Sequence, residues 1–190
     1  ALGAGPGITR VIAAAGADLI DAATDAAALA VQLGRLDTSP KPVTEMAFDP
    51  EQSPSDILAG LPHPVDALVV NPALDDPGSV SSLLAVATAT ATAMQDRGHA
   101  GSIVFVTGIA RTGPAGPAAA QLQAEMESLA VDCAPNGIRV NAVAPGPVGA
   151  NRRDNPLPSS AALLGQTRVH PVEVGKGVWF LLNSGLSSGM

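Results

Sequence analysis

Short apolar runs alternate along this chain with longer segments in which alanine and leucine recur at helical spacing. Apolar runs of about four to eight residues between turn residues are typical of buried parallel strands. We expect strands at residues 17–23, 43–48, 65–73, 101–108 and 138–144. Helices are expected at 9–15, 26–33, 83–94, 117–134 and 172–182, with one short helix around Ile57 and Leu58.

Local signals support this order of elements. Thr24-Asp25 precedes one predicted helix, and Ser53 or Ser55 precedes another; these residue types accept hydrogen bonds from first-turn amides. Residues 83–94 alternate Ala and Thr, which strict alternation would assign to a strand. We prefer a helix, because parallel strands on either side need a crossover. The order predicts an α/β protein with a doubly wound parallel sheet, Rossmann-like, in three α/β/α layers and one domain over residues 1–190.

The composition favours a folded chain and argues against several functions. Hydrophobic residues make up 46% and charged residues 14%, which favours a buried core over disorder. The net charge of -7 leaves no basic patch for nucleic acid. Cys133 is the one cysteine; its helical context favours a buried structural thiol over a reactive one, and a reducing cytoplasm is expected. We see no membrane span or signal peptide, and one Cys with three scattered His lacks the spacing of a metal site.

Two glycine-containing stretches carry a family resemblance. Residues 3–9 read Gly-Ala-Gly-Pro-Gly-Ile-Thr, in which the glycines let backbone amides approach a pyrophosphate at the start of a helix. Residues 137–148 read Gly-Ile-Arg-Val-Asn-Ala-Val-Ala-Pro-Gly-Pro-Val, a strand that ends in a Pro-Gly turn at the ligand-binding edge of an open sheet. With Asp49 and residues 66–73, 101–107 and 128–135, these stretches resemble the short-chain dehydrogenase/reductase family.

The resemblance implies an NAD(P)-dependent oxidoreductase that transfers hydride to or from a carbonyl or alcohol carbon. It assigns cofactor-binding positions to Gly3, Gly5, Gly7, Ile8, Asp49, Asn71, Pro145 and Gly146. Three departures predict that NAD or NADP binds weakly or not at all. Thr9 replaces the third glycine and would crowd the phosphates or the helix-to-sheet contact. Ala23 replaces the acid that often grips the ribose, with Asp21 and Asp25 offset from it, and Pro72-Ala73 stiffens the turn after Asn71.

The family's proton-transfer residues are missing at the matching positions. The family uses a Tyr assisted by a Lys four residues later, and a Ser that orients the substrate. Counted back from Gly137, the Tyr and Lys positions hold Ala115 and Ala119, and the Ser position holds Thr107 or Gly108. The chain has no Tyr, and its lysines, Lys41 and Lys176, are distant in sequence. An alkoxide forming in the transition state needs a proton donor within about 3 Å, and a positioned acid contributes roughly 10²–10⁴-fold.

Three functional hypotheses follow. The first is a non-catalytic member of the family, a subunit of a homo-oligomer or of a hetero-oligomer with a paralogue, paired through the helices at 81–95 and 117–134. The alternative is an active oxidoreductase with an atypical proton donor, such as His170, water or a substrate group; a loop histidine beside Pro171 is the plainer interpretation of that residue. The third is a lyase-like or dehalogenating relative, which the missing Tyr disfavours.

The resemblance also implies more chain than the sequence holds. Family members carry a strand before the glycine loop and another after residue 188, so we expect the first and last strands to be truncated. Loops near Asp75, Thr112 and Ala150 are short for the family. If segments were missing there, the chain would show long gaps or tight shortcuts at those joints. Residues 151–165 predict a loop where the family keeps its substrate-covering segment.

Overall fold

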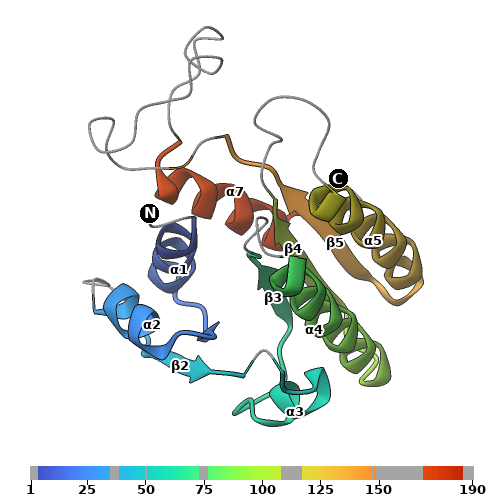
Figure 1. Cartoon of the computed structure of the whole chain (residues 1–190), viewed down its shortest axis with the longest axis horizontal. Coiled ribbons are helices and arrows are strands. Elements are labelled where there is room, and N and C mark those ends of the chain that lie inside the picture. The colour runs from blue at the N-terminus through green and yellow to red at the C-terminus, as the bar shows by residue number, and fades with distance from the viewer. Residues whose placement is uncertain are drawn as a thin grey trace, which may run out of the picture. The chain divides into compact units, whose positions relative to one another are not determined.

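The computed structural model describes residues 4–34, 39–49, 51–72, 77–107, 117–146, 148 and 169–185. Helices and strands alternate along these residues (Figure 1), and every pair of hydrogen-bonded strands is parallel, which confirms the α/β class predicted from the sequence. The chain divides into two compact units, residues 1–50 with 146–179 (unit 1) and residues 51–145 with 180–190 (unit 2). A single domain over the whole chain stays a prediction, and each unit is described by itself.

The described residues of unit 1 form a parallel pair of strands and three helical segments. Its elements are α1 (Gly5–Ala14), β1 (Leu19–Ala23), α2 (Ala26–Leu33), β2 (Val43–Ala47) and the part of α7 (Pro171–Asn183) that ends at Trp179. Leu19 lies opposite Val43 in the ladder. The side chain of Asp25 accepts the Ala27 amide at 3.0 Å, which confirms the predicted start of α2.

Helix α1 begins earlier than the sequence indicated. The prediction placed the glycines in a loop and began the helix at Thr9, whereas the helix starts at Gly5. Proline is favoured in the first turn of a helix, because its fixed φ suits the helix and its missing amide has no partner to lose. Pro6 occupies that place in α1. The glycine-rich stretch from Gly5 onward is therefore helix, and the predicted start at Thr9 is wrong.

Unit 2 contains a three-stranded parallel sheet in the order β3-β4-β5. Its elements are α3 (Pro54–Ala59), β3 (Ala67–Val70), α4 (Pro77–Asp96), β4 (Gly101–Val106), α5 (Pro117–Cys133), η1 (Ala134–Asn136), β5 (Ile138–Val143) and the last turn of α7. Ser53 caps α3 by accepting the Asp56 amide at 3.2 Å. The Ala-Thr repeat lies in α4, so the prediction of a crossover helix over a strand is confirmed.

The core of unit 2 lies between one face of this sheet and helices α4 and α5. Figure 1 shows the two helices side by side over the strands, and both contact β5. Alternate strand residues such as Ile103, Phe105 and Val140 point into this core and are fully buried. Its other members come mainly from the helices: Val70, Val80, Ala87, Ala91, Met94, Leu122, Met126, Ala130, Cys133 and Ile138.

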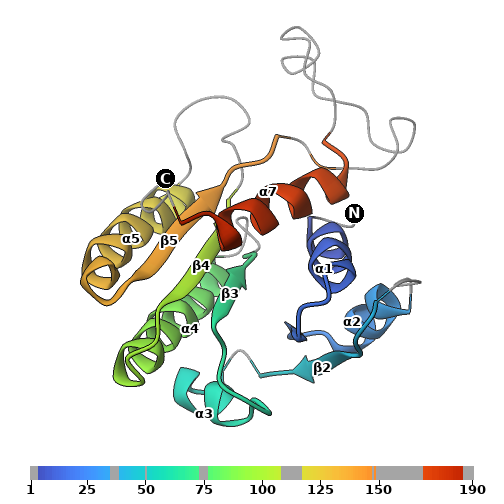
Figure 2. The same ribbon diagram turned by 180° about the vertical axis from the view of Figure 1, so that it is seen from behind.

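The opposite face of the sheet meets the end of α7. Arg139 lies between Ile138 and Val140 in β5 and so points away from the α4–α5 side. Its two terminal nitrogens donate to the carbonyl oxygens of Leu181 and Leu182, each at 2.7 Å. Figure 2 shows this end of α7 across the sheet from α4 and α5. Unit 2 thus has the three α/β/α layers that the sequence predicted.

Hydrogen bonding groups the described strands into two sheets, β1-β2 and β3-β4-β5. The residues that the structure describes hold no strand before α1, and the expected truncation of the first and last strands stays a prediction. Among the described residues, no helix has the length and apolar character that crossing a membrane requires.

Candidate functional site

The first turn of α1 contains three of the predicted cofactor-binding residues, Gly5, Gly7 and Ile8; Gly3 lies outside the described residues. The amides of Gly7 and Ile8 both donate to the carbonyl oxygen of Ala4, at 3.0 and 3.2 Å. Pro6 has no amide hydrogen to offer. The amides of Gly7 and Ile8 are therefore used within the helix itself, although the amino end of a helix dipole still favours an anion.

Gly7 lies against the backbone of α7 within unit 1. A Cβ atom added to Gly7 would come within 2.0 Å of the Pro171 carbonyl oxygen, and one added to Gly175 would come within 2.4 Å of the Gly7 carbonyl oxygen. Both distances are too short for any side chain. Glycine at these two positions is therefore required by the close approach of two helices, which is a structural reason that the sequence alone did not reveal. Its role in cofactor binding stays a prediction.

A polar pair joins α1 to β1. Thr9 is buried, and its hydroxyl lies 2.8 Å from Oδ2 of Asp21 and 3.1 Å from the carbonyl oxygen of Gly5. The sequence pointed to each residue separately, Thr9 as a crowded glycine position and Asp21 as an offset acid. It did not predict their contact, which depends on the rotation of α1 relative to β1.

The end of the β1-β2 sheet carries Asp49, the predicted adenine-capping residue. The Phe48 amide donates to the Ala23 carbonyl oxygen at 3.1 Å and extends the ladder by one step beyond β2. Asp49 follows directly and is exposed. Ala23, at the position of the family's acid, is the last residue of β1. Both lie at the carboxyl edge of the sheet, where the resemblance places the adenosine.

Unit 2 brings Asn71, Thr107 and Pro145 to one edge of its sheet. Asn71 follows β3, Thr107 follows β4 and Pro145 comes two residues after β5, and the register aligns the ends of the three strands. The Thr107 amide donates to the Val143 carbonyl oxygen at 2.8 Å, and its hydroxyl lies 3.5 Å from the same oxygen. Thr107 therefore continues the strand ladder one step beyond β4.

Gly146 belongs to unit 1, where the chain turns after Pro145. A Cβ atom at Gly146 would lie 3.8 Å from the side chain of Val169, in ordinary contact. Val148 forms a parallel bridge with Val169 just beyond. Gly146 and Val148 thus lie beside Val169, two residues before α7 begins. The predicted loop 151–165 lies outside the described residues.

Of the two positions that hold Tyr and Lys in the family, the described residues include the Lys position alone. Ala115 lies outside the described residues, together with Gly108, Ala73 and the joints near Asp75, Thr112 and Ala150. Ala119 lies in the first turn of α5. Lys176, one of the chain's two lysines, forms an exposed ion pair with Glu173 at 2.7 Å on α7.

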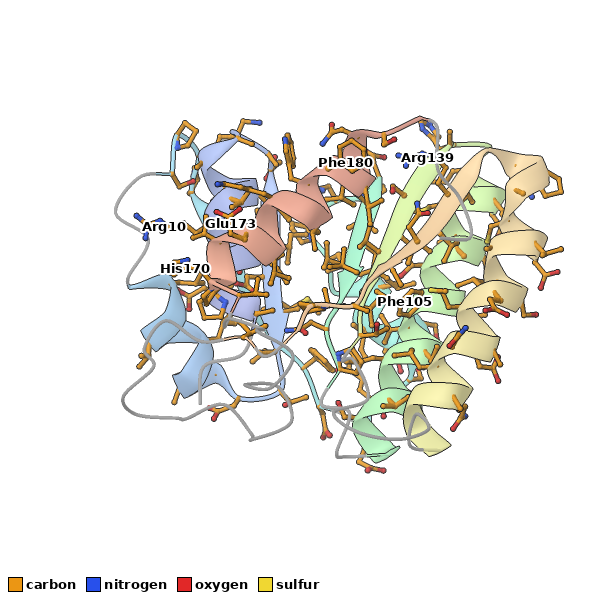
Figure 3. All side chains as sticks on the ribbon, turned by 90° about the horizontal axis from the view of Figure 1, so that it is seen from above. Arg10, Phe105, Arg139, His170, Glu173 and Phe180 are labelled. Carbon is orange, nitrogen blue, oxygen red and sulfur yellow. The ribbon has the colours of Figure 1, made fainter. Side chains whose placement is uncertain are left out.

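His170, the candidate atypical proton donor, sits at the start of α7. Its Nδ1 accepts the Val172 amide at 3.3 Å, and its carbonyl oxygen accepts the Glu173 amide at 2.9 Å. Figure 3 labels His170 and Glu173 at this end of the helix. A ring nitrogen that accepts an amide must be unprotonated, so the geometry makes His170 a helix cap. Among the described residues, no three His, Cys, Asp or Glu side chains gather closely enough to hold a metal ion.

Comparison with known proteins supports the family resemblance. The family model described as enoyl-(acyl carrier protein) reductase matches residues 78–190, more than half of the chain. None of the curated proteins compared with the sequence matches it.

Solved structures share the fold over nearly the whole chain. A short-chain type dehydrogenase/reductase from Mycobacterium marinum is 24% identical, with a TM-score of 0.80, over 98% of this chain and 87% of that one. A short chain dehydrogenase from Bacillus anthracis is 21% identical, with a TM-score of 0.76, over 98% and 88%. A xylitol dehydrogenase solved with NAD⁺ is 19% identical, with a TM-score of 0.77, over 98% and 91%.

Proposed function

Because the chain belongs to the short-chain dehydrogenase/reductase family, we propose that it is a non-catalytic member. We propose that it serves as a subunit of an NAD(P)-dependent dehydrogenase/reductase. The partner is a second copy or, in a hetero-oligomer, an active paralogue of the same family. In the hetero-oligomer, the paralogue carries the activity, while this chain contributes the surface by which the subunits assemble.

One observation carries the proposal: no titrating side chain follows the three strands of unit 2 among the described residues. The residues there are Asn71 and Pro72 after β3, Thr107 after β4, and Ala144 and Pro145 after β5. Reduction of a carbonyl requires a proton at the developing alkoxide. None of these side chains supplies one, and the chain contains no Tyr that could approach from elsewhere.

Helices α4 and α5 present the surface by which we propose that the subunit assembles. On α4, Ser81, Ala85, Thr88 and Thr92 recur at helical spacing and are exposed. On α5, Ala120, Ala124 and Val131 do the same, and Val131 is 73% exposed. Small side chains allow two helix pairs to approach closely.

Several polar side chains of α4 and α5 are hydrogen-bonded within their own helix. The hydroxyl of Thr88 donates to the Leu84 carbonyl oxygen and that of Thr92 to the Thr88 carbonyl oxygen, both at 3.1 Å. On α5, Gln123 donates to Glu127 at 2.9 Å. Groups that are hydrogen-bonded within their own helix lose less free energy when a partner excludes water. The two threonines of α4 can therefore be buried at low cost, which favours association through this helix.

The test compares the purified chain alone with the chain co-expressed with any protein of the same family that is encoded near its gene. We expect the two chains to co-purify at a fixed ratio and the complex, not this chain, to turn over NAD(P)H. Light scattering coupled to size exclusion gives the stoichiometry. A stable monomer that binds no protein of the same family and forms no homo-oligomer contradicts the proposed role.

The alternative function, an active oxidoreductase with an atypical donor, rests on His170. The hydrogen bond from the Val172 amide works against it, because it holds the imidazole in a helix cap. An isolated chain whose NAD(P)H turnover is abolished by His170→Ala would establish the alternative. Thermal melts would distinguish loss of a proton donor from loss of the helix cap. A variant that lacks only the cap is less stable but shows no specific loss of turnover.

A further inference from the structure

The pair formed by Thr9 and Asp21 places a negative charge beside the first turns of α1. A hydroxyl carries one proton, and a carboxylate oxygen is a stronger acceptor than an amide carbonyl. The Thr9 hydroxyl therefore donates to Oδ2 of Asp21 at 2.8 Å, while its oxygen also lies 3.1 Å from the Gly5 carbonyl oxygen. The side chain of Thr9 leans toward the amino end of the helix and draws the carboxylate with it.

This charge lies where a dinucleotide fold receives phosphate. The amino end of a helix that follows a glycine-rich turn favours an anion, and pyrophosphate is the usual one. Here an aspartate of the chain itself supplies negative charge close to that end. A phosphate at the first turn would meet repulsion from Asp21, whose carboxylate is partly buried beside the buried Thr9.

Two further features of the same turn act in the same direction. The amides of Gly7 and Ile8 donate to the Ala4 carbonyl oxygen and so are already used by the helix. The Pro171 carbonyl oxygen covers the side of Gly7 where a Cβ atom would lie. The first turn therefore offers an approaching phosphate few free donors.

We infer that Thr9 and Asp21 are specificity-determining residues that reject the pyrophosphate of NAD and NADP from α1. The inference rests on the proposed function, since it explains how a chain of this family dispenses with its own cofactor. The negative charge of Asp21 offsets the partial positive charge at the amino end of α1, so this end no longer favours phosphate. An uncharged Asn at position 21, or a Gly at position 9, should restore phosphate binding.

The test is calorimetric titration of the full chain with NAD⁺ and NADP⁺. We expect Asp21→Asn and Thr9→Gly each to lower the Kd for NAD⁺ by about tenfold. The first variant removes the nearby negative charge, and the second removes the hydroxyl that holds this charge beside α1. Thr9→Ser keeps the hydroxyl and should bind like the wild type. Asp25→Asn removes the same charge outside the α1–β1 pair and should also leave the Kd unchanged, so it controls for net charge.

Folding is checked by circular dichroism and thermal melting of each variant. If Thr9→Gly loosens α1, Asp21→Asn decides the outcome by itself, because asparagine keeps an acceptor for the Thr9 hydroxyl. Folded variants that bind NAD⁺ no more tightly than the wild type, including no detectable binding in any of them, overturn the inference. Turnover of NAD(P)H by the isolated chain would overturn the proposed function, whereas unchanged Kd values in folded variants of a chain without turnover would overturn the inference alone, so the two failures are distinguishable.

Discussion

Arg139 in β5 donates from both terminal nitrogens to the last turn of α7, to Leu181 and Leu182 at 2.7 Å each. The carbonyl oxygens at the end of a helix lack intrahelical partners, and a cation there also interacts favourably with the helix dipole. One side chain thus caps the last turn of α7, which belongs to unit 2, and joins this turn to the sheet of that unit. Figure 3 labels Arg139 beside this end of the helix.

Replacement of Arg139 by Ala should lower the free energy of unfolding by about 2–4 kcal/mol, because two hydrogen bonds from a charged donor are lost. Arg139→Lys keeps the charge but can donate to only one of the two carbonyl oxygens at a time, so the decrease in the free energy of unfolding should be intermediate. Urea denaturation followed by circular dichroism measures both variants. Equal stability of Arg139→Ala and the wild type would mean that the cap contributes nothing.

Ala at position 7 should destabilise unit 1 although alanine is normally the better helix former. A Cβ atom there would approach the Pro171 carbonyl oxygen to 2.0 Å, so α7 must move. We expect a loss of about 2–3 kcal/mol, the range of overpacking. Gly185→Ala is the matched control, because nothing lies within 4 Å of its added Cβ. A Gly7→Ala variant as stable as the control would refute the close contact of α1 and α7.

The stability of the chain should depend on pH through Cys133. Burial raises the pKa of this thiol, and the neighbouring Asp132 carboxylate raises it further. The folded state keeps the proton at a pH where the unfolded chain releases it, so the free energy of unfolding falls as pH rises past the ordinary cysteine value. With no Tyr titrating in that range, Cys133→Ala should show a visibly shallower decline between about pH 8 and about pH 10. Parallel slopes for the two proteins would exclude this linkage.

Charge placed on the α4–α5 surface should break the proposed assembly. Asp at position 131 would bury an unpaired carboxylate in the interface and weaken association by at least about tenfold. Val31→Asp, at an apolar α2 position that is 55% exposed, is the control and should leave the oligomeric state unchanged. Sedimentation velocity distinguishes the species. Assembly that survives Val131→Asp but fails with Val31→Asp would move the interface to α2.

Most of the fold could be predicted because apolar runs and helix caps are local signals. The bounds of α2 agree with the prediction, and α4 was assigned correctly despite its alternating pattern, because parallel strands require a crossover. The start of α1 was missed although Pro6 marked it. A glycine-rich motif suggested a loop, and the first-turn preference of proline was the stronger physical signal.

The contacts of the site could not be predicted in the same way. The pair of Thr9 and Asp21 and the approach of Gly7 to Pro171 join segments distant in sequence, and both depend on how α1 is rotated against its neighbours. Arg139 could have been flagged, because a charged residue in a buried strand requires partners. Its actual partners, two main-chain carbonyl oxygens, leave no trace in the sequence.

The measurement that tests the central claim most directly is deuteride transfer by the isolated chain. The chain is incubated with NADH or NADPH deuterated at C4 and a panel of aldehydes and ketones, and alcohol products are analysed by mass spectrometry. The account predicts no deuterium in any product above a heat-denatured control, and transfer when the active paralogue is added. Deuterated alcohol formed by this chain alone would contradict the claim that it has lost its proton-transfer chemistry.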